Sequence, residues 1–370
     1  MTRAPRIYIS AGEPSGDAHA APVVRALRRR LPGATIEGLG GPLMADAGVT
    51  LLDRMEALSV VGFVEAIEKL PAHYRLLGRV RRALRAGRYD LVVLVDYPGY
   101  HLRLAGAAAA AGVPVLYYIA PQLWAWGAGR MPRLAAVRRL AVILPFEEDF
   151  FRAHGVPATF VGHPLLDRPA PPSREAARVA LGLDPRRPTL GLFPGSRPLE
   201  VRRLWAAFRD AALLVRAARP EVQLIVAGAA GAVYPDPGAA RVHTGDPELV
   251  FAASDAAICK SGTTTLEAAV ADAPMVIAYR LNRLSWIIAR RLARVSWAGL
   301  VNLVAGRAVA PEFLQDAVRP DALARAVLPL LDGSSPEARR QREGLAAVRQ
   351  RLGGRGAAER VAGLAVELLA

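Results

Sequence analysis

The segment Arg6-Ile-Tyr-Ile-Ser-Ala-Gly-Glu-Pro-Ser-Gly-Asp17 indicates the fold class of this chain. A short β-branched run leads into two closely spaced glycines, and a helical pattern over residues 18–30 follows at once. Strand, glycine turn and helix, in that order, form the unit from which parallel α/β sheets are built. Because short apolar runs alternate with longer helical patterns along the whole chain, we expect an α/β protein with parallel sheets.

A proline-rich segment divides the alternating strand and helix patterns into two series. Expected strands cover residues 6–10, 35–39, 91–95, 115–119, 141–144 and 159–161, and then 189–193, 223–227, 241–243, 256–259 and 275–279. Expected helices include residues 18–30, 62–86, 146–153, 197–218 and 263–271. From Pro320 the pattern is helical to the end, and Gly353 and Gly354 separate a last helix, residues 357–369. Between the two series lies Asp167-Arg-Pro-Ala-Pro-Pro-Ser-Arg174, which is typical of a linker.

We therefore predict two doubly wound domains facing a cleft. The first covers residues 1–168 and the second covers residues 175–354, and a final helix within residues 355–370 is expected to pack back on the first domain. Ligands of open parallel sheets bind at the carboxyl ends of the strands. The turns that follow the strands are therefore the segments in which functional residues are expected.

Composition narrows the classes of function. The 370 residues include 48 Lys+Arg and 33 Asp+Glu, a net charge of +15, and only Lys69 and Lys260 are lysines. The planar fork of arginine binds phosphate, so anionic partners are expected, although the coding bias of a genome can also enrich arginine. No zinc-finger, basic-zipper or aromatic RNA-binding motif accompanies the charge, so we expect no nucleic acid partner. The single cysteine, Cys259, excludes an internal disulfide framework and a Cys-rich zinc site.

The sequence predicts no membrane-spanning segment. Its first ten residues, MTRAPRIYIS, lack the apolar core of a secretory signal. The uncharged stretch Leu104–Gly129 is long enough to span a bilayer, but Gly112, Pro114 and Pro121 divide it into a helix end, a strand and a loop. We expect a cytoplasmic protein that is soluble or bound at a membrane surface.

Two motifs of the first half place polar groups directly after expected strands. In Ser10–Asp17 the two glycines permit a tight turn, and the start of the helix offers free N–H groups to an anion. The loop matches neither the Walker motif nor the dinucleotide-binding motif. Asp96, in Leu91-Val-Val-Leu-Val-Asp-Tyr-Pro-Gly-Tyr-His101, ends a buried strand, where apolar walls raise the pKa of a carboxylate into the range of a general base. The alternative for both motifs is a turn in which the aspartate only caps a helix.

Two loops of the second half suit a diphosphate. Gly191-Leu-Phe-Pro-Gly-Ser-Arg197 combines a strand, a glycine turn and a helix start with an arginine placed for a phosphate. Lys260-Ser-Gly-Thr-Thr-Thr-Leu-Glu267 presents hydroxyl and N–H groups at a helix start, with Glu267 one turn further on, where it can hold a ribose. Either loop alone is compatible with a plain capped helix, but two in one domain favour a ligand.

At this point the sequence resembles a known family, lipid-A-disaccharide synthase. The segments that carry the resemblance occur in order between about Ser10 and about Asp316: AGEPSGD, GLGGPLM, GFVEAIEKL, DYPGYHL, APQLWAW, PFEEDFF, VGHPLLD, FPGSR, KSGTTTLE and VNLVAGRAVAPEFLQ. AGEPSGD and the pair APQLWAW and VGHPLLD are specific to the family, whereas FPGSR and SGTTTLE also resemble other sugar-nucleotide transferases. The resemblance implies the GT-B fold, in which two Rossmann-like domains face a cleft.

The resemblance also implies a reaction. UDP-2,3-diacylglucosamine donates its sugar to the 6-hydroxyl of 2,3-diacylglucosamine 1-phosphate, giving the β-1,6-linked lipid A disaccharide and UDP. Inversion at the anomeric carbon requires a base on the acceptor hydroxyl and stabilisation of charge on the leaving UDP. GT-B enzymes stabilise that charge with helix N-termini and basic side chains, so no metal and no cofactor are expected.

Residue by residue, the resemblance implies a base at Asp96 and an N-terminal active-site loop that includes Glu13. The other residues of that loop are Ser15, Gly16 and Asp17. The implied UDP side comprises Arg197, Ser261, Gly262, Thr263, Thr264 and Glu267, with Asn302 and Gln315 near the nucleotide and sugar.

The chain departs from the family at one motif. Many members carry DxPDFN where this chain has Asp96-Tyr-Pro-Gly-Tyr-His101, so Gly99 and His101 replace an acid and an amide. The change removes a second carboxylate beside Asp96 and leaves His101 as a candidate acid–base helper. A second candidate base is His19, because the related peptidoglycan N-acetylglucosaminyltransferase carries a histidine at the corresponding first turn.

Two segments are candidates for contact with an anionic membrane, which the acylated substrates require. Residues 60–88 interleave apolar side chains with arginines, and residues 280–297 form a second basic and aromatic zone. An interfacial helix and an amphipathic helix buried against the first sheet both explain residues 60–88. The resemblance implies peripheral association with the inner face of the inner membrane and a monomer or homodimer.

Two other classes of function remain open from the sequence. One is another GT-B enzyme, either the peptidoglycan transferase or UDP-N-acetylglucosamine 2-epimerase. The other is a non-catalytic protein that binds a UDP-sugar or a membrane. AGEPSGD and APQLWAW argue against the epimerase.

Overall fold

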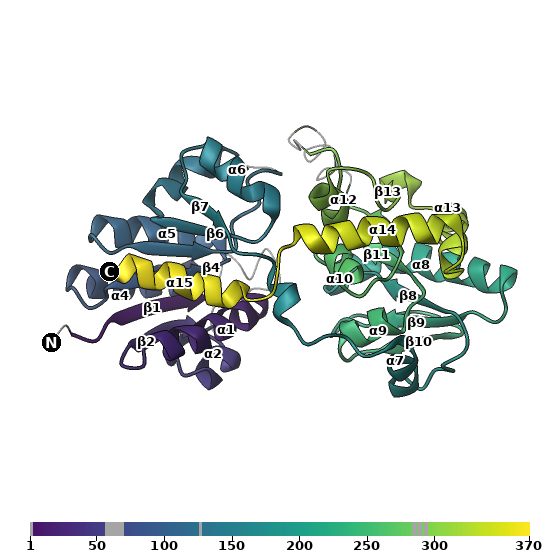
Figure 1. Cartoon of the computed structure of the whole chain (residues 1–370), viewed down its shortest axis with the longest axis horizontal. Coiled ribbons are helices and arrows are strands. Elements are labelled where there is room, and N and C mark those ends of the chain that lie inside the picture. The colour runs from purple at the N-terminus through teal and green to yellow at the C-terminus, as the bar shows by residue number, and fades with distance from the viewer. Residues whose placement is uncertain (1–2, 56–69, 126–127, 283–285, 287–290, 292–294) are drawn as a thin grey trace. The chain divides into compact units, whose positions relative to one another are not determined.

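The protein consists of two compact α/β units, each built on one parallel sheet (Figure 1). The structure is a computed structural model that describes residues 3–55, 70–125, 128–282, 286, 291 and 295–370. Unit 1 comprises Met1–Asp167 and Gly353–Ala370, and unit 2 comprises Arg168–Leu352. The alternation of strand and helix patterns thus correctly predicted an α/β fold with parallel sheets.

Unit 1 contains a seven-stranded sheet in the order β3-β2-β1-β4-β5-β6-β7, with all neighbouring strands parallel. The strands are β1 (Arg6–Ala11), β2 (Thr35–Gly40), β3 (Thr50–Arg54), β4 (Leu91–Val95), β5 (Val115–Tyr118), β6 (Arg139–Val142) and β7 (Ala158–Phe160). All five residues of β4 are fully buried, because helices cover both faces of the sheet.

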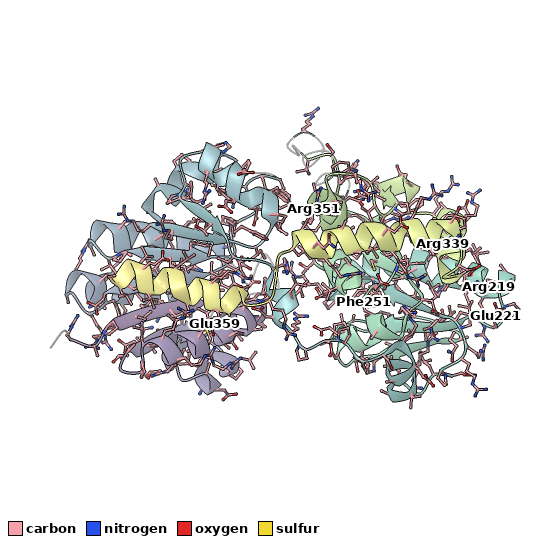
Figure 2. All side chains as sticks on the ribbon, viewed as in Figure 1. Arg219, Glu221, Phe251, Arg339, Arg351 and Glu359 are labelled. Atoms are coloured by element: carbon pink, nitrogen blue, oxygen red, sulfur yellow. The ribbon has the colours of Figure 1, made fainter. Side chains whose placement is uncertain are left out.

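Helices α1 (Pro14–Arg30) and α15 (Ala357–Leu369) pack against each other on one face of this sheet. Val361, Ala362 and Ala365 of α15 belong to the same core as the apolar side of α1, although more than 300 residues separate them. Glu359, labelled on α15 in Figure 2, forms ion pairs with Arg29 and Arg30 of α1. The C-terminal helix is therefore part of unit 1.

The opposite face is covered by α4 (Leu70–Arg85) and α5 (Pro98–Ala110), which contact each other. Leu76, Leu77, Val80 and Leu84 of α4 are buried, whereas its arginines are exposed. The smaller elements of unit 1 are α2 (Pro42–Asp46), η2 (Ala128–Ala136), α6 (Pro145–Ala153) and η3 (Pro164–Asp167).

Unit 2 contains a six-stranded parallel sheet in the order β10-β9-β8-β11-β12-β13. The strands are β8 (Thr189–Phe193), β9 (Gln223–Ala227), β10 (Ala240–His243), β11 (Ala256–Lys260), β12 (Met275–Tyr279) and β13 (Glu312–Leu314). The helices are α7 (Arg174–Ala180), α8 (Pro198–Ala218), α9 (Pro247–Ala253), α10 (Thr264–Val270), α12 (Leu300–Ala305), α13 (Pro320–Val327) and α14 (Pro336–Arg351), with short 3₁₀ turns η4 (Gln315–Ala317) and η5 (Leu328–Leu331). Helices α8 and α13 close the main apolar core against the strands.

The structure differs from the predicted elements mainly at the sheet edges. Strands β3 and β13 were not predicted: β3 is half exposed at an edge, and β13 has only three residues. Strand β6 begins two residues earlier than predicted. Residues 62–69, the first part of the helix predicted over 62–86, lie outside the described residues. Leu104–Gly129 contains the end of α5, then β5, as its glycine and prolines indicated. Among the described residues, no helix combines the length and the apolar character needed to cross a bilayer.

The start of α15 is capped by a residue from far away in the sequence. The N-cap residue, Gly356, has no side chain, and the carboxylate of Asp167 instead accepts hydrogen bonds from the backbone N–H groups of Gly356, Ala357 (3.3 Å) and Ala358 (3.2 Å). A carboxylate at a helix start satisfies donors that have no partner within the helix and interacts favourably with the helix dipole.

We expect Asp167→Ala to lower the free energy of unfolding by about 1–2 kcal/mol, because it removes this cap. Hydrogen exchange of the amides of α15 should accelerate, and urea unfolding gives the overall change. Asp149→Ala, at an exposed position of α6, is the matched control and should change stability little. Unchanged exchange in α15 of the Asp167 variant would show that the helix is held by its apolar face alone.

Candidate active site

The strand order of each sheet reverses beside one central strand. In unit 1, β2 and β3 lie on one side of β1 and β4–β7 lie on the other, and in unit 2 β8 is flanked in the same way by β9 and β11. Ligands of doubly wound proteins bind at such a switch point, outside the carboxyl ends of the strands. The turns after β1 and β4, and those after β8 and β11, contain the four motifs that the sequence singled out.

The turn between β1 and α1 packs tightly against the turn after β4. A Cβ atom at Gly12 would lie 2.3 Å from Cδ1 of Tyr97, so only glycine allows the two turns to meet. Gly16 is buried where α1 approaches β4, and a Cβ there would lie 3.6 Å from the carbonyl oxygen of Val95. The exposed polar side chains of this turn are those of Glu13 and Ser15.

Asp17 lies beneath the turn and holds a neighbouring loop. Its carboxylate accepts hydrogen bonds from the backbone N–H groups of Gly41 (2.9 Å), Leu43 (3.0 Å) and Met44 (3.0 Å), at the start of α2. The side chain is only 1% exposed. Asp17 therefore shapes the loop after β2, and a direct contact with substrate stays a prediction. His19, one turn into α1, is half-buried.

Asp96 lies at the carboxyl end of β4 in an unusual backbone conformation. Asp96 (φ +53°) and Tyr97 (φ +51°) both adopt the left-handed region, which costs about 1–2 kcal/mol for each residue other than glycine. Burial, and secondarily the negative charge of Glu13, raise the pKa of Asp96 to about 6, opposed by a hydrogen bond from the Tyr97 backbone. A carboxylate with this pKa is ionised at pH 7 and is a stronger base than an ordinary aspartate.

His101, in the first turn of α5, lies in the interior of unit 1 behind this turn. Its side chain is 0% exposed, and burial lowers its pKa to about 4. The ring is surrounded by those of Tyr97, Tyr100 and Tyr117. His101 therefore lies next to Asp96 but has no exposed surface through which it could meet a substrate.

In unit 2, the turn after β8 is organised by a residue that the sequence analysis did not single out. Glu200, at the third position of α8, accepts a hydrogen bond from the backbone N–H of Ser196 (3.2 Å) and forms an ion pair with Nζ of Lys260 (3.0 Å). It thereby links the turns after β8 and β11. The available signal was an acid in the first turn of a predicted helix and one of only two lysines in the chain. Arg197 is exposed at the N-cap of α8.

The turn after β11 carries hydroxyl side chains of differing exposure. Ser261 is 6% exposed and its Oγ donates to the carbonyl oxygen of Ala298 (2.6 Å). Gly262 adopts φ +135°, and Thr263 after it is exposed, while Thr264 is half-buried. Burial raises the pKa of Glu267, and the guanidinium of Arg168, 3.8 Å away, opposes that shift.

The last two predicted residues make internal hydrogen bonds. Asn302 is fully buried; its amide donates to Glu312 (2.8 Å) and to the Ala310 carbonyl (2.8 Å), and its oxygen accepts from two backbone N–H groups. The side-chain amide of Gln315 pairs with the backbone of Leu281, at 3.0 and 3.2 Å. Asn302 supports the segment that leads into β13, and Gln315 supports the loop after β12. Their contact with nucleotide or sugar stays a prediction.

The comparisons with known proteins identify the family. A family model described as lipid-A-disaccharide synthetase matches residues 7–360. The lipid-A-disaccharide synthases of Anaeromyxobacter sp. (strain K) and Geobacter metallireducens are 43% and 41% identical to this chain, covering 96% and 98% of it and 96% and 97% of their own length. The chain belongs to the lipid-A-disaccharide synthase family. It is a glycosyltransferase of lipid A disaccharide synthesis, as its motifs predicted.

Solved structures agree with the fold expected of this synthase. The glycotransferase of kitacinnamycin has a TM-score of 0.66 at 19% identity, with all of both chains covered. The calicheamicin glycosyltransferase has a TM-score of 0.60 at 18% identity, covering 100% of this chain and 99% of its own. At this identity the likeness concerns the fold alone, which is GT-B with two Rossmann-like domains.

Burial of Asp96 has a consequence for the stability of the synthase. Its pKa in the folded protein, about 6, lies above the ordinary value of 3.8, so the folded state binds more protons between these pH values. The free energy of unfolding therefore falls as the pH rises through this window.

We expect Asp96→Asn to be more stable than the parent at pH 7, by about 1–3 kcal/mol, and the difference to vanish below pH 4. Urea unfolding at several pH values measures it. Asp46→Asn, at the exposed end of α2, removes one carboxylate without this burial and is the control. If the difference in stability between Asp96→Asn and the parent is the same at pH 7 as at pH 4, the raised pKa of Asp96 is contradicted.

Proposed function

We propose that this synthase transfers 2,3-diacylglucosamine from its UDP derivative to the 6-hydroxyl of 2,3-diacylglucosamine 1-phosphate, with Asp96 as the base. The carboxylate of Asp96 takes the hydroxyl proton as the acceptor oxygen forms its bond to the anomeric carbon. The bond from that carbon to the phosphate oxygen breaks, and UDP leaves with the electron pair. The observation that carries the proposal is a carboxylate with a pKa of about 6 at the switch point of unit 1.

Glu13 has two roles in this proposal. Its charge helps to raise the pKa of Asp96, and its exposed side chain, with that of Ser15, is available to bind sugar hydroxyls. His19, half-buried one turn further along α1, is the alternative base.

The leaving UDP is held by the turns of unit 2. Arg197 and Lys260 supply positive charge for the diphosphate, and the backbone N–H groups at the start of α8 add donors. Thr263 and Thr264 supply hydroxyls and Glu267 binds the ribose. We propose that these groups, without a metal or a cofactor, stabilise the charge that develops on UDP.

The decisive experiment measures UDP release and analyses the lipid product by mass spectrometry. We expect UDP and the disaccharide only when both acylated substrates are present, with EDTA leaving the rate unchanged. Asp96→Asn should lower kcat on the order of 10²–10⁴-fold while the affinity for UDP stays the same. The kcat/KM of the parent should rise with pH through about 6, because the ionised form of Asp96 is the active one.

Two variants distinguish the candidate bases. Glu13→Gln should retain most of the turnover and move the acidic limb of the pH profile downward, because the charge that raises the pKa of Asp96 is gone. His19→Gln should retain both turnover and profile. Near-normal turnover of Asp96→Asn, with loss in His19→Gln, would transfer the role of base to His19.

We further propose that unit 1 meets the membrane through arginines. Arg79, Arg81, Arg82 and Arg85 of α4 are exposed, while the apolar side of this helix is buried in unit 1. Arg81 and Arg85 line a groove of about 530 Å³ together with Arg103 of α5 and Arg133 of η2. Such a surface suits anionic headgroups, each basic side chain near the membrane contributing about 1 kcal/mol. Val60, Val61, Phe63, Val64 and Ile67, and also Arg290 and Arg294, lie outside the described residues.

We expect salt-sensitive binding to vesicles that contain anionic phospholipid, measured by co-sedimentation. Replacing Arg79, Arg81, Arg82 and Arg85 by Gln should weaken binding and flatten its dependence on salt. The matched control replaces four exposed arginines of unit 2, Arg202, Arg216, Arg339 and Arg340, by Gln and should bind as the parent does. Equal loss of vesicle binding in both variants would show that only net charge matters. Unchanged vesicle binding of the α4 variant would contradict the proposed membrane contact.

A further inference from the structure

The left-handed turn at Asp96 and Tyr97 is held by two side chains that converge on one atom. The carbonyl oxygen of Asp96 accepts a hydrogen bond from the hydroxyl of Tyr117 (2.7 Å) and lies 2.6 Å from Nδ1 of His101. Tyr117 comes from β5 and His101 from α5, and both side chains are 0% exposed. Two buried donors on a single carbonyl fix the orientation of that peptide group and so oppose the strain of the turn.

The contacts of His101 determine its protonation. A carbonyl oxygen can only accept, so Nδ1 carries the proton and donates it to Asp96. Nε2 lies 2.8 Å from Oγ of Ser10 on β1. In a neutral imidazole Nε2 accepts, so the Ser10 hydroxyl donates to it. The remaining groups that face the ring, Tyr97, Tyr100 and Tyr117, supply no charge that would stabilise an imidazolium.

We propose that His101 and Tyr117 are positioning residues for Asp96: they hold its carbonyl group, thereby direct its carboxylate, and His101 exchanges no proton with substrate. The inference rests on the proposed role of Asp96 as base. It gives the two hydrogen bonds of His101 one direction. Ser10 of β1 donates to Nε2 of His101, and Nδ1 of His101 donates to the carbonyl oxygen of Asp96. A catalytic group misplaced by about 1 Å can lose on the order of 100-fold in rate, so such supports matter for turnover.

Kinetics of paired variants test the positioning role. Tyr117→Phe removes one hydroxyl donor, whereas Tyr118→Phe removes a hydroxyl from the next residue of β5, which belongs to the core beside α15. We expect kcat to fall roughly 10- to 100-fold in Tyr117→Phe, with KM for the donor and the acidic limb retained, and to stay near the parent value in Tyr118→Phe. His101→Asn keeps one donor for the carbonyl and should be roughly tenfold more active than His101→Leu.

Nitrogen-15 NMR of the histidine rings provides a readout besides activity. In the parent, the His101 signals, assigned by their absence in His101→Asn, should show a protonated Nδ1 and an unprotonated Nε2 from pH 5.5 to 8. If His101→Leu does not fold, the spectrum of the parent and the kcat of Tyr117→Phe still test the proposal.

Three outcomes would overturn the proposal. The first is a ring that gains a second proton in this pH range. The second is a kcat of Tyr117→Phe equal to that of Tyr118→Phe, and the third is loss of one limb of the pH profile in both His101 variants. Failure of Asp96 as the base would show separately, as full turnover of Asp96→Asn with the His101 spectrum unchanged.

Discussion

Within each of the two sheets, every described strand runs parallel to its neighbours, and this alignment determines where the turns after the strands lie. Because every strand of a sheet runs the same way, all carboxyl ends lie along one edge, and the turns that follow them meet there. The order of strands then reverses beside β1 and beside β8. This reversal places the turns after β1 and β4 next to each other in unit 1, and those after β8 and β11 next to each other in unit 2.

In unit 1 the same burial that makes Asp96 useful also makes it costly. A carboxylate in a largely apolar site has a raised pKa, and the folded state loses stability when that group ionises. Two consecutive residues in the left-handed region add strain at the same place. Gly12, whose missing side chain accommodates the ring of Tyr97, shows that the surrounding turn is built around this conformation.

In each unit, buried polar residues shape the turns, and other polar residues on the same turns face solvent. Asp17, Ser261 and Asn302 are buried, and each is bonded to backbone groups of neighbouring loops. Glu13, Ser15, Arg197 and Thr263 are exposed on the turns that these bonds define. The Glu200–Lys260 ion pair has a similar effect, because it links the start of α8, after β8, to the end of β11. Phe251, labelled in Figure 2, stacks on Phe193 at the end of β8 and fixes the point from which that turn departs.

From the sequence we predicted the α/β class, most strands, several of the longer helices, the four motif turns and the family, because periodicity, glycine turns and motif spacing are local properties of a chain. It could not determine β3 and β13, whose short or half-exposed runs carry little pattern. A direct contact of Asp17 and Asn302 with a ligand stays a prediction. The tertiary structure alone showed that these two side chains are buried and accept hydrogen bonds from backbone N–H groups. The same holds for the raised pKa of Asp96, the neutral ring of His101, the Glu200–Lys260 pair and the cap that Asp167 provides to α15. Burial, charge proximity and hydrogen-bond partners arise between segments that are distant along the chain, and no local pattern records them.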